Sequence, residues 1–178
     1  MTDQLKIVTL CTGNVARSVM LGYMLSALAQ REGLEWEVRG AGTHVAEGAA
    51  MSGRTRDALV ALGKLGEPRY GLHRSHQLQL DDVEWADVLL CAEADHVGYV
   101  RRHFSVGAAK TVQLAQFVAR APVGAARHEQ VAFVASLEPD SRLDVTDPAG
   151  GDQTVYHACA RQLWSLAGDF AALRAASV

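Results

Sequence analysis

Residues 5–18 read Leu-Lys-Ile-Val-Thr-Leu-Cys-Thr-Gly-Asn-Val-Ala-Arg-Ser, and this stretch decides the fold. Its first six residues are mostly apolar or β-branched, which predicts a buried parallel strand that ends at Cys11. From Ser18 onward apolar residues recur at helical spacing, which predicts an amphipathic helix beginning at about Ser18; they are Val19, Met20, Met24, Leu25 and Leu28. The loop between strand and helix therefore lies at a helix N-terminus.

This loop has the features of a phosphate-binding site. Unpaired backbone N–H groups and the positive end of the helix dipole meet here, and a run of such amides forms a concave nest for a tetrahedral anion. Gly13 and Asn14 are residue types that tolerate the left-handed backbone that such a nest needs. The residues that we expect to bind phosphate are Thr12, Gly13, Asn14, Val15, Ala16, Arg17 and Ser18.

Cys11 stands at the opening of the nest and is the expected nucleophile. Amide dipoles and the nearby Arg17 guanidinium favour a thiolate over a thiol, and the thiolate is the reactive form. The planar guanidinium offers two donors to phosphate oxygens, where the charge of the transition state lies. The Ser18 hydroxyl can donate to the sulfur and so make it a better leaving group when water attacks a phospho-cysteine. We therefore expect Cys11 and Arg17 to be catalytic residues.

With these residues the chain resembles the low-molecular-weight protein tyrosine phosphatase family. The N-terminal signature of that family, a strand followed by Cys-x-Gly-Asn-x-x-Arg-Ser, matches residues 11–18. The resemblance continues through Ala41-Gly42-Thr43, Leu89-Leu90-Cys91 and Asp147-Pro148, so it spans nearly the whole chain with one insertion. It implies a phosphatase that forms a phospho-cysteine on Cys11 and uses neither a cofactor nor a metal ion.

A carboxylic acid is also needed, because an alkoxide or phenoxide leaves slowly unless it is protonated. In the resembled family this acid is the Asp of an Asp-Pro pair on a C-terminal loop, which matches Asp147. The residues alone indicate only a turn from Asp147 to Gly151, and Asp144 and Asp152 are near enough to be alternative acids. We expect Asp147 to act as general acid and then as general base.

His73 is expected to support the loop. It matches a family histidine that helps to hold the loop asparagine, here Asn14, in a strained conformation. The serine that usually connects the two is Gly40 in this chain, so the hydrogen-bond relay is incomplete. Without the resemblance, a single histidine near an apolar stretch is more often a packed core or surface residue. The expected supporting residues are thus Asn14, Ser18 and His73.

The substrate slot departs from the pattern of tyrosine-specific members. Those members have an aromatic residue shortly after Ala-Gly-Thr and another directly after Asp-Pro, where this chain has His44-Val45-Ala46 and Ala149. Each missing ring forfeits about 0.5–1.5 kcal/mol of stacking on a phenyl group. The Asp-Pro-x-Gly-Gly pattern also resembles the bacterial phosphoarginine phosphatase branch, although that branch has Phe at x and Thr where this loop has Val15. We expect protein phosphotyrosine or a small phosphomonoester as substrate, with protein phosphoarginine as an alternative.

Two further hypotheses lie outside phosphatase chemistry. Arsenate reductases share the fold but need two further cysteines close together in a mobile segment, and only Cys91 is in the right region. A phosphate-binding module with little turnover would suit the bare slot and Gly40. Such a module, however, has little chemical reason to keep Cys11, Arg17 and Asp147 together.

The composition is that of an ordinary compact enzyme. With 178 residues, 49% of them hydrophobic and 21% charged, the chain is expected to form one domain over residues 1–178. The net charge of −3 argues against nucleic-acid binding, and no apolar run reaches the roughly 18 residues of a membrane span. The N-terminus lacks a signal-peptide pattern, and the three cysteines form neither a disulfide framework nor a metal pattern. We expect a cytoplasmic protein; the sequence indicates no oligomeric state.

Strand and helix signals alternate along the chain. Further strands are expected at residues 35–39, 86–90 and 110–112, and further helices at 54–62, 96–104 and 154–173. This alternation predicts an α/β fold: a parallel four-stranded sheet with helices on both faces and the phosphate loop after the first strand. Two more helical patterns, at 113–120 and 129–137, indicate an insertion around residues 113–140. The insertion forms either surface helices or a wall of the substrate slot.

Overall fold

A four-stranded parallel sheet forms the centre of the molecule. The computed structural model describes residues 4–173. Leu5 in the first strand pairs with Trp36, and Cys11 with Gly42, whereas Leu10 pairs with Cys91 on the other side. The first strand thus lies inside the sheet, with its carboxyl end beside those of two neighbours. The strands are β1 (Leu5–Cys11), β2 (Trp36–Gly42), β3 (Val88–Cys91) and β4 (Thr111–Gln113), in the order β2-β1-β3-β4.

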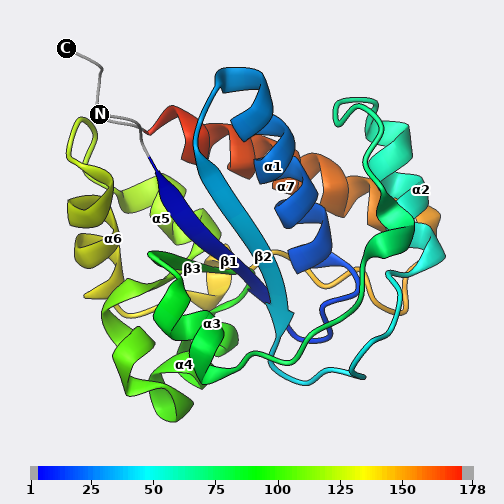
Figure 1. Ribbon diagram of the computed structural model, residues 1–178. Helices are drawn as coiled ribbons and strands as arrows, with labels where there is room; N and C mark the ends of the chain where they lie inside the picture. Colours follow the sequence, from blue (N-terminus) through cyan, green and yellow to red (C-terminus); the bar gives the residue numbers. More distant parts are fainter. Residues whose placement is uncertain (1–3, 174–178) are drawn as a thin grey trace.

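Alternate side chains of β1 pack on opposite faces of the sheet. Ile7 and Cys11 lie in a core formed mainly with α1 (Arg17–Glu32) and α7 (Gln153–Ala172), whereas Val8 and Leu10 lie in a second core formed with α3 (Leu80–Trp85) and α4 (Ala94–His103). Helices therefore cover both faces (Figure 1), which confirms the predicted α/β fold. The α-helices are α1 (Arg17–Glu32), α2 (Gly53–Leu62), α3 (Leu80–Trp85), α4 (Ala94–His103), α5 (Leu114–Arg120), α6 (Arg127–Ala135) and α7 (Gln153–Ala172).

The sequence-based expectations agree with these elements to within a few residues, apart from α3, which they miss. Six residues are too few to show a helical repeat, and α3 begins with a local contact in which the N–H of Gln79 donates to Asp82 (3.0 Å). No helix within residues 4–173 is long and apolar enough to cross a membrane. Short 3₁₀ turns occupy Tyr70–Leu72, Ser105–Lys110 and Ser141–Leu143.

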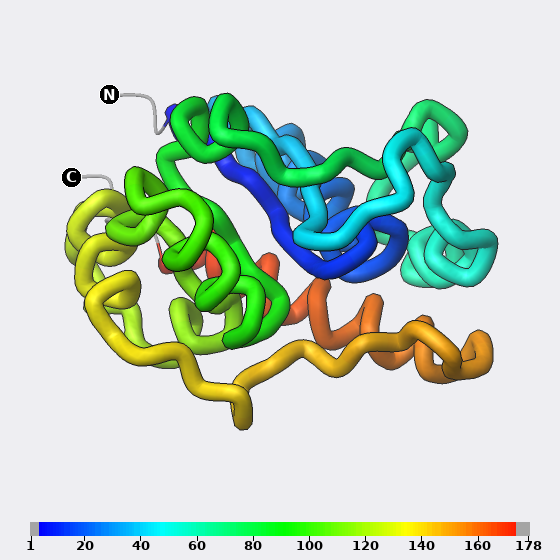
Figure 2. Tube along the Cα trace, turned by 90° about the horizontal axis from the view of Figure 1, so that it is seen from below, coloured from blue at the N-terminus to red at the C-terminus, as the bar shows by residue number. Residues whose placement is uncertain are grey.

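Helices α5 and α6 occupy the segment in which an insertion is expected. Val131 and Val134 of α6 are buried in the main core, and Arg101 donates to the carbonyl groups of Ala135 (2.8 Å) and Leu137 (2.9 Å). Figures 1 and 2 both show α6 at the end of the molecule away from the loop that follows β1. This position favours additional surface helices over a wall of the substrate slot.

The chain after residue 143 returns to the carboxyl edge of the sheet. The N–H of Val145 donates to the carbonyl of Ala92, just after β3 (2.9 Å), and Figure 2 shows this segment running alongside the loop after β1. Because all four strands are parallel, the residues that follow them gather at one edge, where open α/β sheets bind ligands.

Candidate active site

The loop between β1 and α1 is held by hydrogen bonds to its carbonyl groups. The N–H of Thr43 donates to the carbonyl of Cys11 (3.0 Å), and that of His44 donates to the carbonyl of Thr12 (2.9 Å). Within the described residues, no acceptor is bonded to the N–H groups of residues 13–16. A loop whose carbonyls are bound from outside and whose amides are free has the character of the predicted phosphate nest.

Asn14 shapes this loop from a fully buried position. Its φ of 51° is left-handed, and no other non-glycine residue between 4 and 173 has a positive φ. Its side-chain nitrogen donates to Ser18 Oγ (2.8 Å), and its side-chain oxygen accepts from the N–H of His76 (3.0 Å). The Nε2–H of His73 donates to the Asn14 carbonyl (2.9 Å). Three contacts thus fix the strained residue.

The contact of His73 with Asn14 runs through the backbone and needs no intervening serine. A Cβ atom at Gly40 would lie 2.9 Å from Asn14 Nδ2, so the Asn14 amide fills the space that a side chain at position 40 would use. Asn14 therefore reaches Ser18 directly. The supporting role of His73 stays a prediction, and its position suits that role.

Cys11 Sγ lies 3.0 Å from Ser18 Oγ, and the cysteine is buried at the carboxyl end of β1. Because Ser18 Oγ already accepts a hydrogen bond from Asn14, its own hydrogen is available to the sulfur. The chain of contacts Asn14–Ser18–Cys11 thereby links the strained residue to the expected nucleophile.

The buried guanidinium of Arg17 contacts two carboxylates, and one of them is Asp147, the expected general acid. Its Nη1 contacts the Glu93 carboxylate and donates to the Val145 carbonyl (2.9 Å), and its Nη2 lies 3.0 Å from Asp147 Oδ2. Arg17 is only 2% exposed, so the two carboxylates compensate a charge that is removed from water. Asp147 is 44% exposed and therefore remains accessible to a substrate.

Glu93 and His96 also belong to the site, although no sequence pattern predicted them. They follow β3, whose carboxyl end adjoins that of β1, and this position is the signal that could have revealed them. His96 Nδ1 accepts from the N–H of Glu93 (3.1 Å), so the neutral ring carries its proton on Nε2. Nε2 lies 3.0 Å from Thr12 Oγ1 and 3.3 Å from Glu93 Oε2. His96 thus connects the loop to the carboxylate that contacts Arg17.

Protonation of His96 is expected to destabilise the fold. Burial lowers the pKa of His96 from 6.5 to about 4, and the charge of Arg17 lowers it as well. The charges of Glu93, Asp95 and Asp147 act in the opposite direction but are outweighed. Between these values the unfolded chain binds the proton and the folded chain does not, so stability falls as the pH drops through this window. Urea unfolding measures the free energy of unfolding at about pH 7 and at about pH 5. The decrease between the two pH values should be about 1–2 kcal/mol larger in the wild type than in His96→Gln. Equal losses would show that His96 does not titrate in this way.

The two alternative acids have structural contacts instead. Asp144 Oδ1 accepts from the N–H of Ala94 (2.7 Å) and from Gln113 Nε2 (2.7 Å), and burial raises the pKa of this carboxyl group. Asp152 accepts from the N–H of Val155 (3.2 Å) and caps α7. Neither carboxylate contacts Arg17, so the geometry favours Asp147 as the acid.

The remaining cysteines do not form a relay with Cys11. Cys91 lies in the core on the other face of the sheet, and Cys159 is buried on α7; all three are free thiols. Burial raises the pKa of the Cys159 thiol to about 12 and that of Cys91 further still. The arsenate reductase hypothesis therefore finds no support.

Residues 4–173 contain no group of three or more His, Cys, Asp or Glu side chains arranged to hold a metal ion.

The walls of the slot differ on its two sides. Beyond Thr12, the ring of His44 contacts that of Tyr99 edge-on (centroids 5.6 Å apart), and Tyr99 also contacts His103 (4.5 Å). On the other side, the N–H of Ala149 donates to Asp147 Oδ1 (3.0 Å) in a tight turn without an aromatic ring. Aromatic rings thus adjoin the loop on the side of α4, whereas the turn at residues 147–151 contains none.

Known proteins resemble this chain along nearly its whole length. Residues 6–176 match the family model of the low molecular weight phosphotyrosine protein phosphatase. The chain is 29% identical to a protein-arginine-phosphatase of Geobacillus stearothermophilus over 161 residues, which cover 90% of each chain. The solved structure of an arginine phosphatase from that organism is similar with a TM-score of 0.73 and 28% identity, covering 94% of this chain and 91% of the other. A solution structure of a low molecular weight protein tyrosine phosphatase from Bacillus subtilis gives 0.74 and 25%, covering 95% and 96%.

Proposed function

Because the chain belongs to the low molecular weight phosphotyrosine protein phosphatase family and is a cysteine-dependent phosphatase, we propose that Cys11 is its nucleophile, Arg17 its phosphate ligand and Asp147 its general acid. The observation that carries these roles is the convergence of the three groups at one edge of the sheet. Cys11 ends β1 beside the free amides of the loop, and Asp147 reaches Arg17 from a distant segment.

In the first step, Cys11 Sγ attacks phosphorus and a sulfur–phosphorus bond forms while the bond to the leaving group breaks. The loop amides and the Arg17 fork bind the equatorial oxygens, where negative charge accumulates. Asp147 donates its proton to the departing atom. Phosphate takes over Arg17 Nη2 from Asp147, which frees this carboxyl group to face the leaving group.

In the second step, water displaces the sulfur. Asp147, now a carboxylate, removes a proton from the water, whose oxygen bonds to phosphorus as the sulfur–phosphorus bond breaks. The Ser18 hydroxyl, 3.0 Å from Sγ, stabilises the departing thiolate. Inorganic phosphate leaves, and Arg17 returns to Asp147.

Protein phosphotyrosine is the substrate that we propose first. Val15 presents an apolar side chain on the loop, and the His44–Tyr99 pair provides rings beside Thr12. The second candidate is protein phosphoarginine. It is supported by the similarity to the arginine phosphatase of Geobacillus stearothermophilus and by the turn at Ala149, which has no aromatic ring. A guanidinium leaving group needs no ring contact on that side, whereas a phenyl ring gains no stacking there.

Peptides of one sequence that carry phosphotyrosine, phosphoarginine or phosphoserine at the same position distinguish these substrates. We expect kcat/KM for phosphotyrosine to exceed that for phosphoserine by at least about tenfold, because only the ring can contact His44 and Tyr99. A kcat/KM higher for phosphoarginine than for phosphotyrosine would assign the enzyme to the second candidate. Tyr99→Ala should lower turnover of the phosphotyrosine peptide and leave that of the other two peptides unchanged. The matched control, Tyr70→Ala, should leave turnover of all three unchanged.

A further inference from the structure

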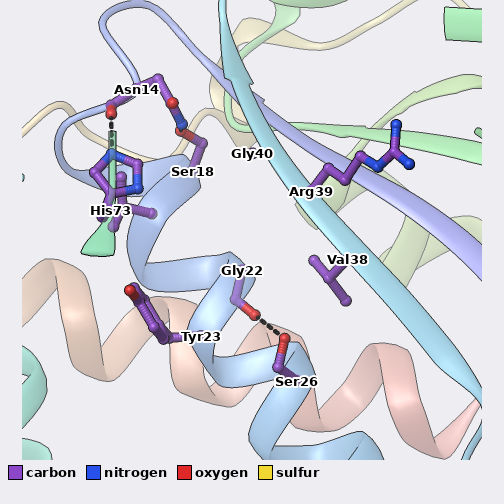
Figure 3. A pocket seen from close by; sticks show the side chains of 10 residues that line it. Asn14, Ser18, Gly22, Tyr23, Ser26, Val38, Arg39, Gly40 and His73 are labelled. Atoms are coloured by element: carbon purple, nitrogen blue, oxygen red, sulfur yellow. Dashed lines mark hydrogen bonds between the residues drawn. The ribbon is translucent and has the colours of Figure 1, made fainter. Parts of the chain in front are cut away.

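A second pocket lies behind the phosphate loop, between α1 and β2. It has a volume of about 170 Å³, and Figure 3 shows the side chains around it. The residues that matter to its chemistry are Ser18, Gly22, Tyr23, Val38, Gly40 and His73. None of these is required to hold phosphate in the reaction described above except Ser18, which therefore adjoins both sites.

Gly22 opens the space on this side of α1, whereas the space at Gly40 is filled by the Asn14 amide, whose Nδ2 would lie 2.9 Å from a Cβ there. Gly22 lies in the interior of α1 and Gly40 in the interior of β2, where each weakens its element by about 0.5–1 kcal/mol relative to alanine. A Cβ at Gly22 would make only ordinary contacts, with Thr9 Oγ1 at 3.5 Å and Val38 Cγ1 at 3.9 Å. Close packing therefore does not require a glycine at position 22, because an alanine side chain would fit there.

The pocket lining combines apolar groups with hydroxyl groups. The ring of Tyr23 is held edge-on by Tyr70 (5.0 Å), and Val38 lines the pocket from β2. The hydroxyls of Ser18, Tyr23 and Ser26 also line it, and that of Ser26 donates to the carbonyl of Gly22 (2.9 Å). His73 donates from Nε2 to the Asn14 carbonyl, which leaves Nδ1 as a lone-pair acceptor on the side of the ring that faces the pocket (Figure 3). Burial lowers the pKa of His73, so this lone pair persists at neutral pH.

No ionised side chain enters the pocket. Arg39 contributes to its lining, but its guanidinium points away and stacks on the ring of Trp85 at 3.8 Å. A charged ligand would therefore lose its hydration without gaining a partner. The walls favour an uncharged aromatic ring whose one O–H or N–H reaches the His73 acceptor.

We propose that this pocket is a second binding site, which takes a small uncharged aromatic molecule with one hydrogen-bond donor, of the phenol or indole class. Its occupant would contact Ser18, whose Oγ lies 3.0 Å from Cys11 Sγ, and Asn14, which fixes the loop. The site is thus placed to alter the reactivity of Cys11 without occupying the phosphate nest. The proposal goes beyond the proposed function and does not depend on it.

Titration of the full chain with phenol and with indole, followed by amide NMR shifts, tests the proposal. We expect saturable shifts at Gly22 and Gly40 with a Kd on the order of 1 mM, unchanged when inorganic phosphate is added in excess. Val38→Phe should fill the pocket and weaken binding at least tenfold, whereas Val60→Phe, at an exposed position on α2, should leave it unchanged. Gly22→Ala gives a second, milder filling variant that is expected to fold well and to weaken binding.

Three results would overturn the second site. They are the absence of saturable shifts, shifts that fall on residues 12–17 and vanish on adding phosphate, and binding that survives both filling variants. The Cys11→Ser protein should bind phenol as the wild type does. An enzyme without phosphatase activity that still binds phenol at this pocket would therefore count against the proposed catalytic roles and not against the second site.

Discussion

Replacing Cys11 by Ser is expected to lower kcat for p-nitrophenyl phosphate by a factor on the order of 10⁴ or more, without added metal. The substitution exchanges one atom, so the contact with Ser18 and the loop can persist. A serine hydroxyl is far less acidic than a thiol, and it has no free base at this position. Asp147 is needed as an acid, Glu93 is bound to Arg17, and His96 uses Nδ1 for a backbone N–H.

The matched control is Cys91→Ser, which makes the same exchange on the other face of the sheet. This variant should keep most of the wild-type turnover, because Cys91 contacts neither Arg17 nor the loop amides. Rapid quenching of the wild type with substrate should in addition trap one phosphate on Cys11. Full activity in Cys11→Ser would exclude Cys11 as the nucleophile. A wild type that neither turns over substrate nor becomes phosphorylated would instead support a phosphate-binding module.

Local sequence signals were sufficient for the fold and for the loop. The apolar run of β1, the Gly13-Asn14 pair and the helical repeat after Ser18 are contiguous in sequence, so their consequence could be predicted without the rest of the chain. The contact of Arg17 with Asp147 joins distant segments, and the residues alone indicated only a turn at Asp147. The resemblance to a family supplied what local patterns could not.

Contacts that depend on the order of the strands were not predictable in this way. Glu93 reaches Arg17 only because β3 pairs with β1, and Asp144 becomes a structural residue because Ala94, after β3, and Gln113, at the end of β4, both donate to it. Periodicity along the chain contains no information on which strands are neighbours. The second pocket is of the same kind, since Gly22 and Val38 line one space only after α1 packs on β2.

Replacing Asp147 by Asn is expected to lower kcat by a factor of about 10²–10⁴, and the loss should depend on the leaving group. A p-nitrophenolate leaves readily without a proton, whereas a phenolate or the group released from a phosphopeptide needs one. The loss should therefore be smaller for p-nitrophenyl phosphate than for phenyl phosphate. The measurement is kcat for both substrates in the wild type and in the variant.

The same variant should bind inorganic phosphate more tightly. In the free enzyme Asp147 Oδ2 occupies Arg17 Nη2 at 3.0 Å, and a phosphate ion must displace it and then lie beside its charge. A neutral amide removes both costs, so the inhibition constant of phosphate should fall while kcat also falls. Replacing a residue that merely kept the loop in place would lower kcat and raise the inhibition constant of phosphate, because a disordered site binds phosphate less well.

Asp152→Asn is the control for this pair of effects. Asp152 accepts a hydrogen bond at the start of α7 and has no contact with Arg17. Asn caps a helix about as well as Asp, so the replacement removes only the charge at the helix N-terminus; it should reduce stability by about 0.3–1 kcal/mol without a dependence on the leaving group. If Asp147→Asn instead lowered turnover of both substrates equally and weakened phosphate binding, the acid would have to be sought elsewhere. A larger effect of Asp152→Asn on phenyl phosphate than on p-nitrophenyl phosphate would then transfer the role to Asp152.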